Sequence, residues 1–331
     1  MKVAVVGAGS WGTVVAAIAG SKAPTTLWAR RPELAAAVNT TGENPDYLAG
    51  FPLDGDVTAT TSLEEALDGA DVLVMAVPSH GFRTVLENAA QVIGNELPIL
   101  SLSKGIEQPT LMRMTEVCAN VLPDHDRARI GVLSGPNLAR EIASGQPAAT
   151  VVAFEDAETA AMLQDLLITP TFRVYTNDDV IGAESAGALK NVMAIAAGMS
   201  HGLGFGDNTI ATLITRALAE LSRLGAAMGG NPRTFFGLAG MGDLIATCIS
   251  SQSRNHRVGF GLGQGKKLDD IIAEMKMVAE GVKSTRGVLA LADRHDVEMP
   301  IATQVGLVLY EGEEPKTAVR RLMTREARSE E

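Results

Sequence analysis

Cysteine and long apolar runs are both scarce in this sequence. Cys118 and Cys248 are the only cysteines among 331 residues, and they lie far apart, so neither a disulfide framework nor a zinc site is expected. No apolar run reaches the roughly 18 residues that a membrane span needs. The first residues form a strand pattern instead of a signal peptide. We therefore expect a cytoplasmic protein with no bound metal and no membrane span.

Positive charge is the minority charge. The chain has 28 Lys and Arg against 39 Asp and Glu, which gives a formal net charge of −11. Nucleic acids and anionic membranes need a basic protein face, so the composition argues against both as general partners. An anionic small molecule would have to be held by a few well-placed cations against this overall field.

The first 180 residues alternate between short β-rich runs and helical patterns, which is typical of βαβ crossovers and a mostly parallel sheet. The predicted strands are Lys2–Val6, Thr25–Trp28, Val57–Thr60, Asp71–Val77, Ile99–Ser103, Ile130–Leu133, Ala149–Phe154 and Arg173–Tyr175. The predicted helices between them include Gly12–Ala19, Glu33–Val38, Leu63–Leu67, Phe82–Val92 and Leu111–Val121.

Strand patterns nearly vanish after Asp178 and Asp179. A long Ala- and Leu-rich helical pattern runs over Gly182–Ala227, interrupted by a Gly-rich turn at His201–Asp207, and further helices are predicted at Leu268–Met277, Ser284–Arg294, Ile301–Tyr310 and Pro315–Thr324. The sequence therefore predicts an α/β protein. A Rossmann-like, doubly wound domain spans 1–180, and an all-helical domain for substrate binding and catalysis spans 181–331. The oligomeric state is left open between a monomer and a homodimer.

A glycine motif follows the first predicted strand. In Gly7-Ala8-Gly9-Ser10-Trp11-Gly12, the first glycine permits a tight turn and Gly9 lets the backbone approach a pyrophosphate. Gly12 lets the following helix pack against the strand. The free N–H groups of that helix N-terminus favour an anion. The motif predicts dinucleotide binding, although a Gly-rich turn without a ligand has the same local pattern.

The acidic residue that usually ends the second strand of such a site is missing. Arg30 and Arg31 follow Ala29 there. A carboxylate would bind the ribose 2′-OH of NAD, whereas arginine pairs with a 2′-phosphate. We therefore expect NADP(H), or acceptance of both NADP(H) and NAD(H). The alternative is that both arginines simply begin a surface helix at Pro32.

Two lysines are candidate reactive groups. Lys104 follows a predicted strand at its carboxyl end, the edge where doubly wound sheets bind ligands, with a solvated loop lysine as the alternative. Lys190 lies in a helix that is apolar on all sides, with no acid three or four residues away. Because burial favours the uncharged amine, Lys190 suits acid–base chemistry, unless its side chain reaches the surface. The adjacent Asn191 could donate to a carbonyl oxygen, although taken alone it is more typical of an asparagine that caps or packs a helix.

Two further segments carry polar groups. Asp243 follows a Gly-Met-Gly loop, where it either caps a helix or reaches Lys190 from another helix. Ser253, Arg254 and Asn255 open a predicted helix, and an arginine at a helix start forms a ready phosphate site. A capped surface helix is the alternative for this segment.

Taken together, these motifs resemble the bacterial NAD(P)-dependent glycerol-3-phosphate dehydrogenase family over essentially the whole chain. The matching segments are GAGSWGT (7–13), SKGIE (103–107), SGPNLARE (134–141), ALKNVMAIAAG (188–198), GLAGMGDLIATC (237–248), SRNHRVG (253–259) and VAEGV (278–282). The resemblance implies interconversion of dihydroxyacetone phosphate and sn-glycerol 3-phosphate by hydride transfer. The product would feed phospholipid synthesis.

The resemblance also implies residue roles. Lys190 matches the catalytic proton donor and acceptor, while Lys104 touches both cofactor and substrate, and Asn191 and Asp243 orient the reacting groups. The substrate positions are Lys104, Gly135, Asn137, Lys190, Asp243, Ser253, Arg254 and Asn255. The cofactor positions are Gly7, Gly9, Ser10, Trp11, Gly12, Arg30, Arg31, Lys104, Ala139, Arg254, Val278 and Glu280. Asn137 departs from the family pattern, which commonly has a small hydroxyl residue there.

Two other functions remain open at this point. A related two-domain dehydrogenase acting on a 3-hydroxy acid could use Arg254 for a carboxylate, although the Ser253–Asn255 segment and the loop before Asp243 argue against it. A non-catalytic NAD(P)H sensor would be expected to lack the catalytic lysine, and Lys190 is present.

Overall fold

The computed structural model describes residues 1–108, 110–275, 279–326 and 329. The chain divides into two compact units, Met1–Ser185 and Ala186–Glu331. The dividing point falls within helix α8 (Val180–Gly202), five residues after the predicted boundary at 180. Within the described residues, no helix combines the length and apolar character that crossing a membrane requires.

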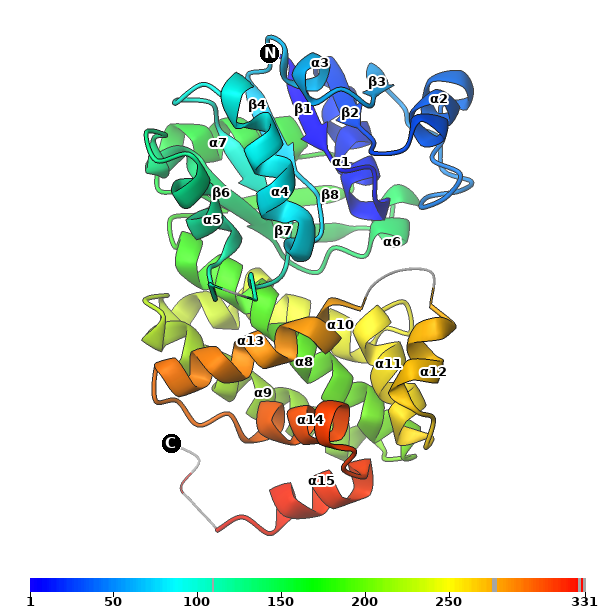
Figure 1. Cartoon of the computed structure of the whole chain (residues 1–331), viewed down its shortest axis with the longest axis vertical. Helices are drawn as coiled ribbons and strands as arrows, with labels where there is room; N and C mark the ends of the chain where they lie inside the picture. The colour runs from blue at the N-terminus through cyan, green and yellow to red at the C-terminus, as the bar shows by residue number, and fades with distance from the viewer. Residues whose placement is uncertain (109, 276–278, 327–328, 330–331) are drawn as a thin grey trace. The chain divides into compact units, whose positions relative to one another are not determined.

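The first unit contains one eight-stranded sheet, shown in Figure 1. Its strands are β1 (Val3–Val6), β2 (Thr25–Trp28), β3 (Val57–Thr60), β4 (Val72–Met75), β5 (Ile99–Ser101), β6 (Ile130–Ser134), β7 (Ala148–Ala153) and β8 (Phe172–Asn177). All eight predicted strands are confirmed with small shifts at their ends. Their order is β3-β2-β1-β4-β5-β6-β7-β8, and every neighbouring pair is parallel except β6 and β7.

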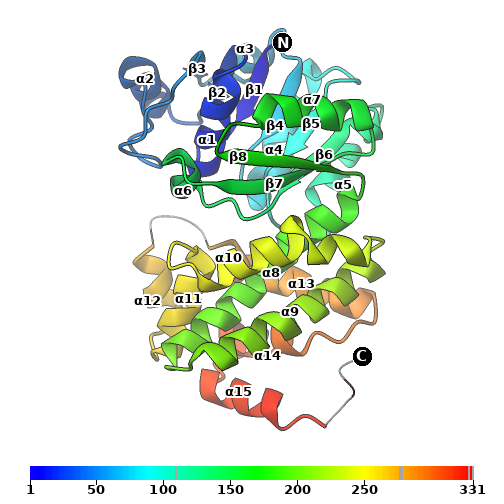
Figure 2. The same cartoon turned by 180° about the vertical axis from the view of Figure 1, so that it is seen from behind.

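Helices cover both faces of this sheet, so its strands are buried on two sides. The helices are α1 (Ser10–Gly20), α2 (Pro32–Thr41), α3 (Leu63–Leu67), α4 (Ser79–Ala89), α5 (Met114–Val121), α6 (Ala139–Ala143) and α7 (Ala157–Leu167). One apolar core includes residues of α1, α2 and α7, and a second core includes residues of α3, α4 and α5. Helix α4 crosses the near face of the sheet in Figure 1, and α7 crosses the near face in the opposite view of Figure 2.

The strand order reverses between β1 and β4. Chain segments that leave the carboxyl ends of these two strands run in opposite directions, which opens a crevice where doubly wound sheets bind ligands. The register pairs Val6 of β1 with Trp28 of β2 on one side and Met75 of β4 on the other. The glycine motif begins at the next residue and therefore lies at this reversal.

One predicted helix begins too early. The pattern over Leu111–Val121 predicted a continuous helix, but α5 begins at Met114. Leu111 has a φ of 61°, outside the right-handed helical region, and Arg113 forms an isolated antiparallel bridge with Ile106. The Glu116 carboxylate then accepts a hydrogen bond from the Arg113 N–H at 2.8 Å, which defines where the helix starts.

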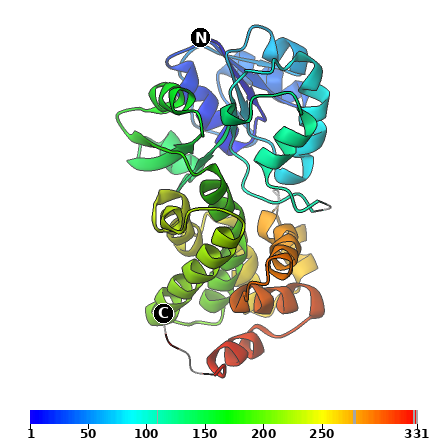
Figure 3. The same ribbon diagram turned by 90° about the vertical axis from the view of Figure 1, so that its left-hand side faces the viewer.

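The second unit is helical, as predicted. Helix α8 is buried along nearly its whole length and runs through this unit, as Figure 3 shows from the side. The other α-helices are α9 (Asp207–Ala227), α10 (Asp243–Ile249), α11 (Arg254–Gly263), α12 (Leu268–Ala273), α13 (Glu280–Arg294), α14 (Pro300–Glu311) and α15 (Pro315–Met323). The predicted helix over Leu268–Met277 is therefore shorter, and its residues 276 and 277 lie outside the described ones. A π-helical turn at Leu238–Gly242 was not predicted.

A buried carboxyl group joins two of these helices. Glu220 of α9 accepts hydrogen bonds from the backbone N–H groups of Ile301 at 2.8 Å and Ala302 at 3.4 Å, in the first turn of α14. Helix α14 has no side-chain cap at its own N-cap residue, Met299. Glu220 thus provides from another helix the acceptor that a cap would supply. Burial raises the pKa of Glu220 to about 7.

This raised pKa predicts a pH-dependent stability. The unfolded chain loses the Glu220 proton near pH 4.5, whereas the folded chain keeps it up to about pH 7. Stability from this group is therefore fully present below pH 4.5 and is lost as pH rises through 7. Urea unfolding of Glu220→Gln should show a smaller fall in unfolding free energy between pH 5 and 8, by on the order of 2 kcal/mol. The exposed Glu311→Gln serves as the control, and parallel pH curves for Glu220→Gln and the unaltered protein would contradict the prediction.

Candidate functional site

The glycine turn after β1 is shaped for close packing at two positions and is open at a third. Gly7 has a φ of 123°, and a Cβ there would lie 2.6 Å from the carbonyl oxygen of Ala76. A Cβ at Gly12 would lie 2.0 Å from the Gly7 carbonyl oxygen, whereas a Cβ at Gly9 would meet no atom within 4 Å. Gly7 and Gly12 are thus required by the packing of strand and helix, and Gly9 leaves its backbone approachable.

This turn fits a dinucleotide phosphate. Helix α1 has no side-chain cap at its N-cap residue Gly9, so its first N–H groups are available to an anion. The Ser10 hydroxyl donates to the carbonyl oxygen of Tyr47 at 2.7 Å and keeps its acceptor lone pairs. The buried indole N–H of Trp11 has no hydrogen-bond partner within the described structure. An uncapped helix start beside an unsatisfied buried donor is what a phosphate-containing ligand would complete.

The two arginines after β2 differ in their surroundings. Arg31 is the N-cap residue of α2 and pairs with the carboxylate of Asp46, which raises the pKa of the guanidinium. Arg30 is exposed and makes no ion pair within the described residues. Pro32 opens α2, so the surface-helix interpretation holds alongside the cofactor interpretation. Ala139 begins α6 and packs against the same apolar core as α1. The predicted cofactor residue Val278 lies outside the described residues.

Three predicted substrate residues come together at the ends of β5 and β6. Lys104 donates from Nζ to the carbonyl oxygen of Gly135 at 2.9 Å. Asn137 donates from Nδ2 to the hydroxyl of Thr150 at 3.1 Å, and Thr150 in turn donates to the carbonyl oxygen of Ser134. The other side-chain atom of Asn137, Oδ1, is a buried acceptor with no donor in the described part of the chain.

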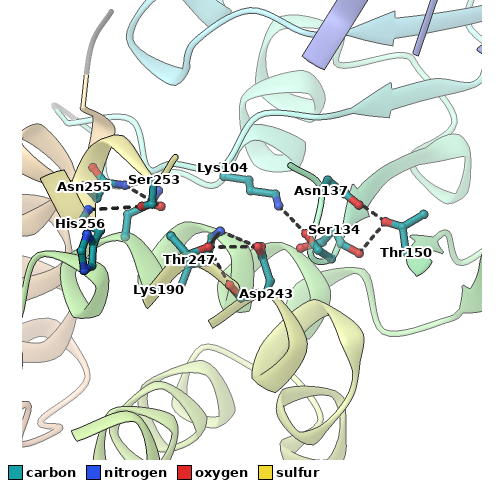
Figure 4. A network of polar contacts seen from close by, with 12 residues as sticks. Lys104, Ser134, Asn137, Thr150, Lys190, Asp243, Thr247, Ser253, Asn255 and His256 are labelled. Atoms are coloured by element: carbon teal, nitrogen blue, oxygen red, sulfur yellow. Dashed lines mark hydrogen bonds and ion pairs between the residues drawn. The ribbon is translucent and has the colours of Figure 1, made fainter. Parts of the chain in front are cut away.

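Lys190 of α8 forms a buried ion pair with Asp243 of α10. The Lys190 Nζ lies 2.5 Å from Asp243 Oδ1, and the two residues are only 5% and 2% exposed. Lys190 also donates to the hydroxyl of Thr247 at 2.5 Å, and that hydroxyl donates to the Asp243 carbonyl oxygen at 2.6 Å, as Figure 4 shows. The ammonium is thus held in one place by two oxygen acceptors. Asp243 does not cap a helix, because the N-cap residue of α10 is Gly242.

A second network joins α8, α11 and α13. The amide of Asn255 donates to Asn191 Oδ1 at 3.0 Å and accepts from the backbone N–H of Gly281 at 2.9 Å. Ser253 caps α11 by accepting from the His256 N–H at 3.2 Å, so its capping role is present. Arg254, the first residue of α11, keeps part of its surface open to solvent, although other protein groups surround its guanidinium. Desolvation by the surrounding protein lowers its pKa, and the negative charge of Glu280 opposes that shift.

Two contacts of these networks were not predicted. Thr247 lies four residues after Asp243 on α10, and this spacing places both side chains on one helix face, which was the available signal. His256 Nε2 lies 2.7 Å from His201 Nδ1, and burial and then the neighbouring His201 lower the pKa of His256. No local signal relates His201 to His256, because 55 residues separate them.

Known proteins match this chain over nearly its full length. Family models for the N-terminus and C-terminus of NAD-dependent glycerol-3-phosphate dehydrogenase match residues 2–160 and 179–320. A glycerol-3-phosphate dehydrogenase [NAD(P)+] 2 of Sphingopyxis alaskensis is 55% identical over 92% of this chain and 91% of its own length. The corresponding enzyme of Thermobifida fusca is 52% identical over 99% of this chain and 98% of its own length.

A solved structure agrees with these relatives. The crystal structure of glycerol-3-phosphate dehydrogenase from Coxiella burnetii has a TM-score of 0.93 and 37% identity, covering 98% of this chain and 99% of that chain. The predicted doubly wound unit followed by a helical unit is thereby confirmed as the fold. With both family models matched and relatives above 50% identity, the chain belongs to the NAD-dependent glycerol-3-phosphate dehydrogenase family.

Proposed function

We propose that this protein interconverts dihydroxyacetone phosphate and sn-glycerol 3-phosphate with NADPH or NADH. The observation that carries the proposal is the buried Lys190, held by Asp243 and Thr247, in a chain of this family. The glycerol 3-phosphate formed would supply the backbone for phospholipid synthesis. Both cysteines are free thiols, which supports the expected cytoplasmic location.

The reaction needs a hydride, a proton and a polarised carbonyl. The nicotinamide ring, when bound, supplies the hydride to the ketone carbon. Lys190 donates the proton to the oxygen that becomes the hydroxyl, and in the reverse direction it accepts that proton. Asp243 and Thr247 fix the direction of the lysine Nζ, since both accept hydrogen bonds from it. Lys104 and Asn191 help to orient and polarise the carbonyl group.

The substrate phosphate is assigned to the start of α11. Arg254 offers a planar fork that can bind two phosphate oxygens, while Ser253 and Asn255 lie beside it in the first turn. Gly135 and Asn137 are assigned to the remainder of the substrate. The Asn137 Oδ1 atom, which lacks a donor within the described chain, supports contact with a substrate hydroxyl.

The two halves of the chain then have separate tasks. We propose that residues 1–180 bind the dinucleotide and that residues 181–331 bind the substrate and carry the proton transfer. The 3-hydroxy acid alternative is less well supported, because the named relatives are glycerol-3-phosphate dehydrogenases. The sensor alternative is less well supported because Lys190 has an intact set of partners.

The cofactor preference is tested by steady-state kinetics with dihydroxyacetone phosphate and each reduced cofactor. We expect kcat/KM with NADPH to be at least comparable to that with NADH, because arginines replace the usual acid after β2. Arg30→Ala/Arg31→Ala should shift the ratio toward NADH by about 10–150-fold, the scale of a charge-assisted hydrogen bond of roughly 1.5–3 kcal/mol. An unaltered enzyme ten times better with NADH would count against the preference.

The role of Lys190 is tested by Lys190→Met, which keeps the apolar stem and removes the ammonium. We expect kcat to fall by about 10²–10⁴, the usual scale of acid–base catalysis, with cofactor binding little changed. The exposed Lys283→Met on α13 should retain full activity. If the single variant unfolds because Asp243 is left unpaired, Lys190→Met/Asp243→Asn removes that charge. Near-normal turnover in a folded variant would refute the assignment.

The phosphate site is tested by comparing two substrates in two enzymes. Arg254→Ala should lower kcat/KM with dihydroxyacetone phosphate by two orders of magnitude or more, since a bidentate charged contact is lost. The loss with unphosphorylated dihydroxyacetone should be far smaller, because that substrate lacks the phosphate. Arg254→Lys should restore activity only in part, because lysine provides a charge without the fork.

An equal loss with both substrates would show that Arg254 does not bind the substrate phosphate. Arg254 would then serve the cofactor, a role that the family resemblance also implies, or the fold. Measuring cofactor binding and the melting temperature of Arg254→Ala separates these two outcomes.

A further inference from the structure

A short segment after α2 folds back onto the dinucleotide turn. Asn44 is fully buried and donates from Nδ2 to the carbonyl oxygen of Ala8 at 2.9 Å and to the hydroxyl of Thr13 at 2.8 Å. Its Oδ1 accepts from the Tyr47 N–H at 3.1 Å, and the carbonyl oxygen of Tyr47 accepts from Ser10. Three hydrogen bonds therefore fix the Asn44–Tyr47 segment against the start of α1, and a fourth closes the segment on itself.

This segment brings a carboxylate to the end of β2. Asp46 lies between the anchored residues Asn44 and Tyr47, and it pairs with Arg31. The Arg31 guanidinium also lies over the Tyr47 ring, 5.8 Å from its centroid. The side chains of Arg31 and Asp46 are 47% and 46% exposed, so a ligand can reach both from solvent. The sequence has no acidic residue at the end of β2. Asp46, which lies 15 residues after Arg31, brings a carboxylate to that place.

We propose that Asp46 is a specificity-determining residue that competes with the 2′-phosphate of NADP(H) for the guanidinium of Arg31. The proposal rests on the proposed dinucleotide function of this domain. In the free protein Arg31 has its positive charge balanced by Asp46. NADP(H) must displace that carboxylate or bind beside it, whereas NAD(H) has no 2′-phosphate and does not compete. Asp46 therefore reduces the advantage that Arg31 gives to NADP(H), and it favours the use of both cofactors.

The direction of the effect follows from how Arg31 is held. Its backbone is fixed as the N-cap residue of α2, and its guanidinium lies over the Tyr47 ring, so its placement does not depend on Asp46 alone. Removing the Asp46 charge releases the guanidinium N–H donors and removes repulsion between the carboxylate and a phosphate dianion. Both changes strengthen binding of the 2′-phosphate.

The test measures ligand binding without substrate, so it does not depend on catalysis. Calorimetry at low salt compares adenosine 2′,5′-bisphosphate with AMP, which lacks the 2′-phosphate. Asp46→Asn should tighten binding of the bisphosphate by about two- to fivefold, the scale of an exposed ion pair, and leave AMP binding within about 1.5-fold. Glu33→Gln is the matched control, because it removes the same charge from the first turn of α2, where Glu33 acts on Arg31 more weakly than Asp46 does.

A second pair of variants tests the competition itself. The effect of Asp46→Asn is expressed as the logarithm of the ratio of bisphosphate affinities with and without this substitution. In an Arg31→Ala background this effect should be less than half of its value in the unaltered protein. An equal effect in both backgrounds, or an equal effect of Glu33→Gln, would overturn competition for Arg31 in favour of a general charge effect. Weaker bisphosphate binding by Asp46→Asn would overturn the proposal by showing that Asp46 positions Arg31. If the protein lacks the proposed dehydrogenase activity, these binding results are unaffected.

Discussion

The requirement that a buried lysine have a partner organises the helical unit. Lys190 lies in the middle of α8, which is buried along nearly its whole length, and an isolated ammonium there would be strongly unfavourable. Asp243 satisfies it from α10, and removing one member of such a pair typically costs about 3–5 kcal/mol. Placement of Asp243 depends in turn on the π-helical turn at Leu238–Gly242, where a Cβ at Gly240 would lie 2.1 Å from the Phe235 carbonyl oxygen. The glycine-rich loop is thus part of what holds the Lys190–Asp243 pair.

Much of the first unit could be predicted because its elements carry strong local patterns. Each strand is a short run rich in β-branched and apolar residues between helical segments, so all eight strands were located. The orientation of β7 could not be read in this way. A buried strand has the same composition whether its neighbour is parallel or antiparallel, and only the register with β6 shows that the pair is antiparallel. The predicted start of a helix was wrong where the backbone conformation of one residue decided it, as at Leu111.

The candidate site was less accessible to sequence reasoning, because its contacts join distant segments. The charge of Lys190 and the apolar helix around it indicated that a partner was needed, but only the fold brings Asp243 to it across 53 residues. Likewise, the missing acid after β2 was visible in the sequence, while the return of Asp46 depends on Asn44 fitting beneath the glycine turn. Residue chemistry was predictable wherever a local pattern was unusual. The pairing of Asp243 with Lys190 could be foreseen only as one of two alternatives, and the pairing of Asp46 with Arg31 was not foreseen.

A common electrostatic arrangement links these pairs to the acidity of the chain. With a net charge of −11, the protein must attract anionic ligands through local cations. Lys190 is paired with Asp243, and Arg31 is paired with Asp46. The negative charge of Glu280 opposes the desolvation that lowers the pKa of Arg254. The carboxylates paired with Lys190 and Arg31 hold those two side chains in place when no ligand is bound. The same carboxylates weaken the attraction for an incoming phosphate. The buried pair at Lys190 fixes the position of the lysine Nζ, as the proposed proton transfer requires. The exposed pair at Arg31 can be displaced by a ligand, so it can set the proposed preference between NAD(H) and NADP(H).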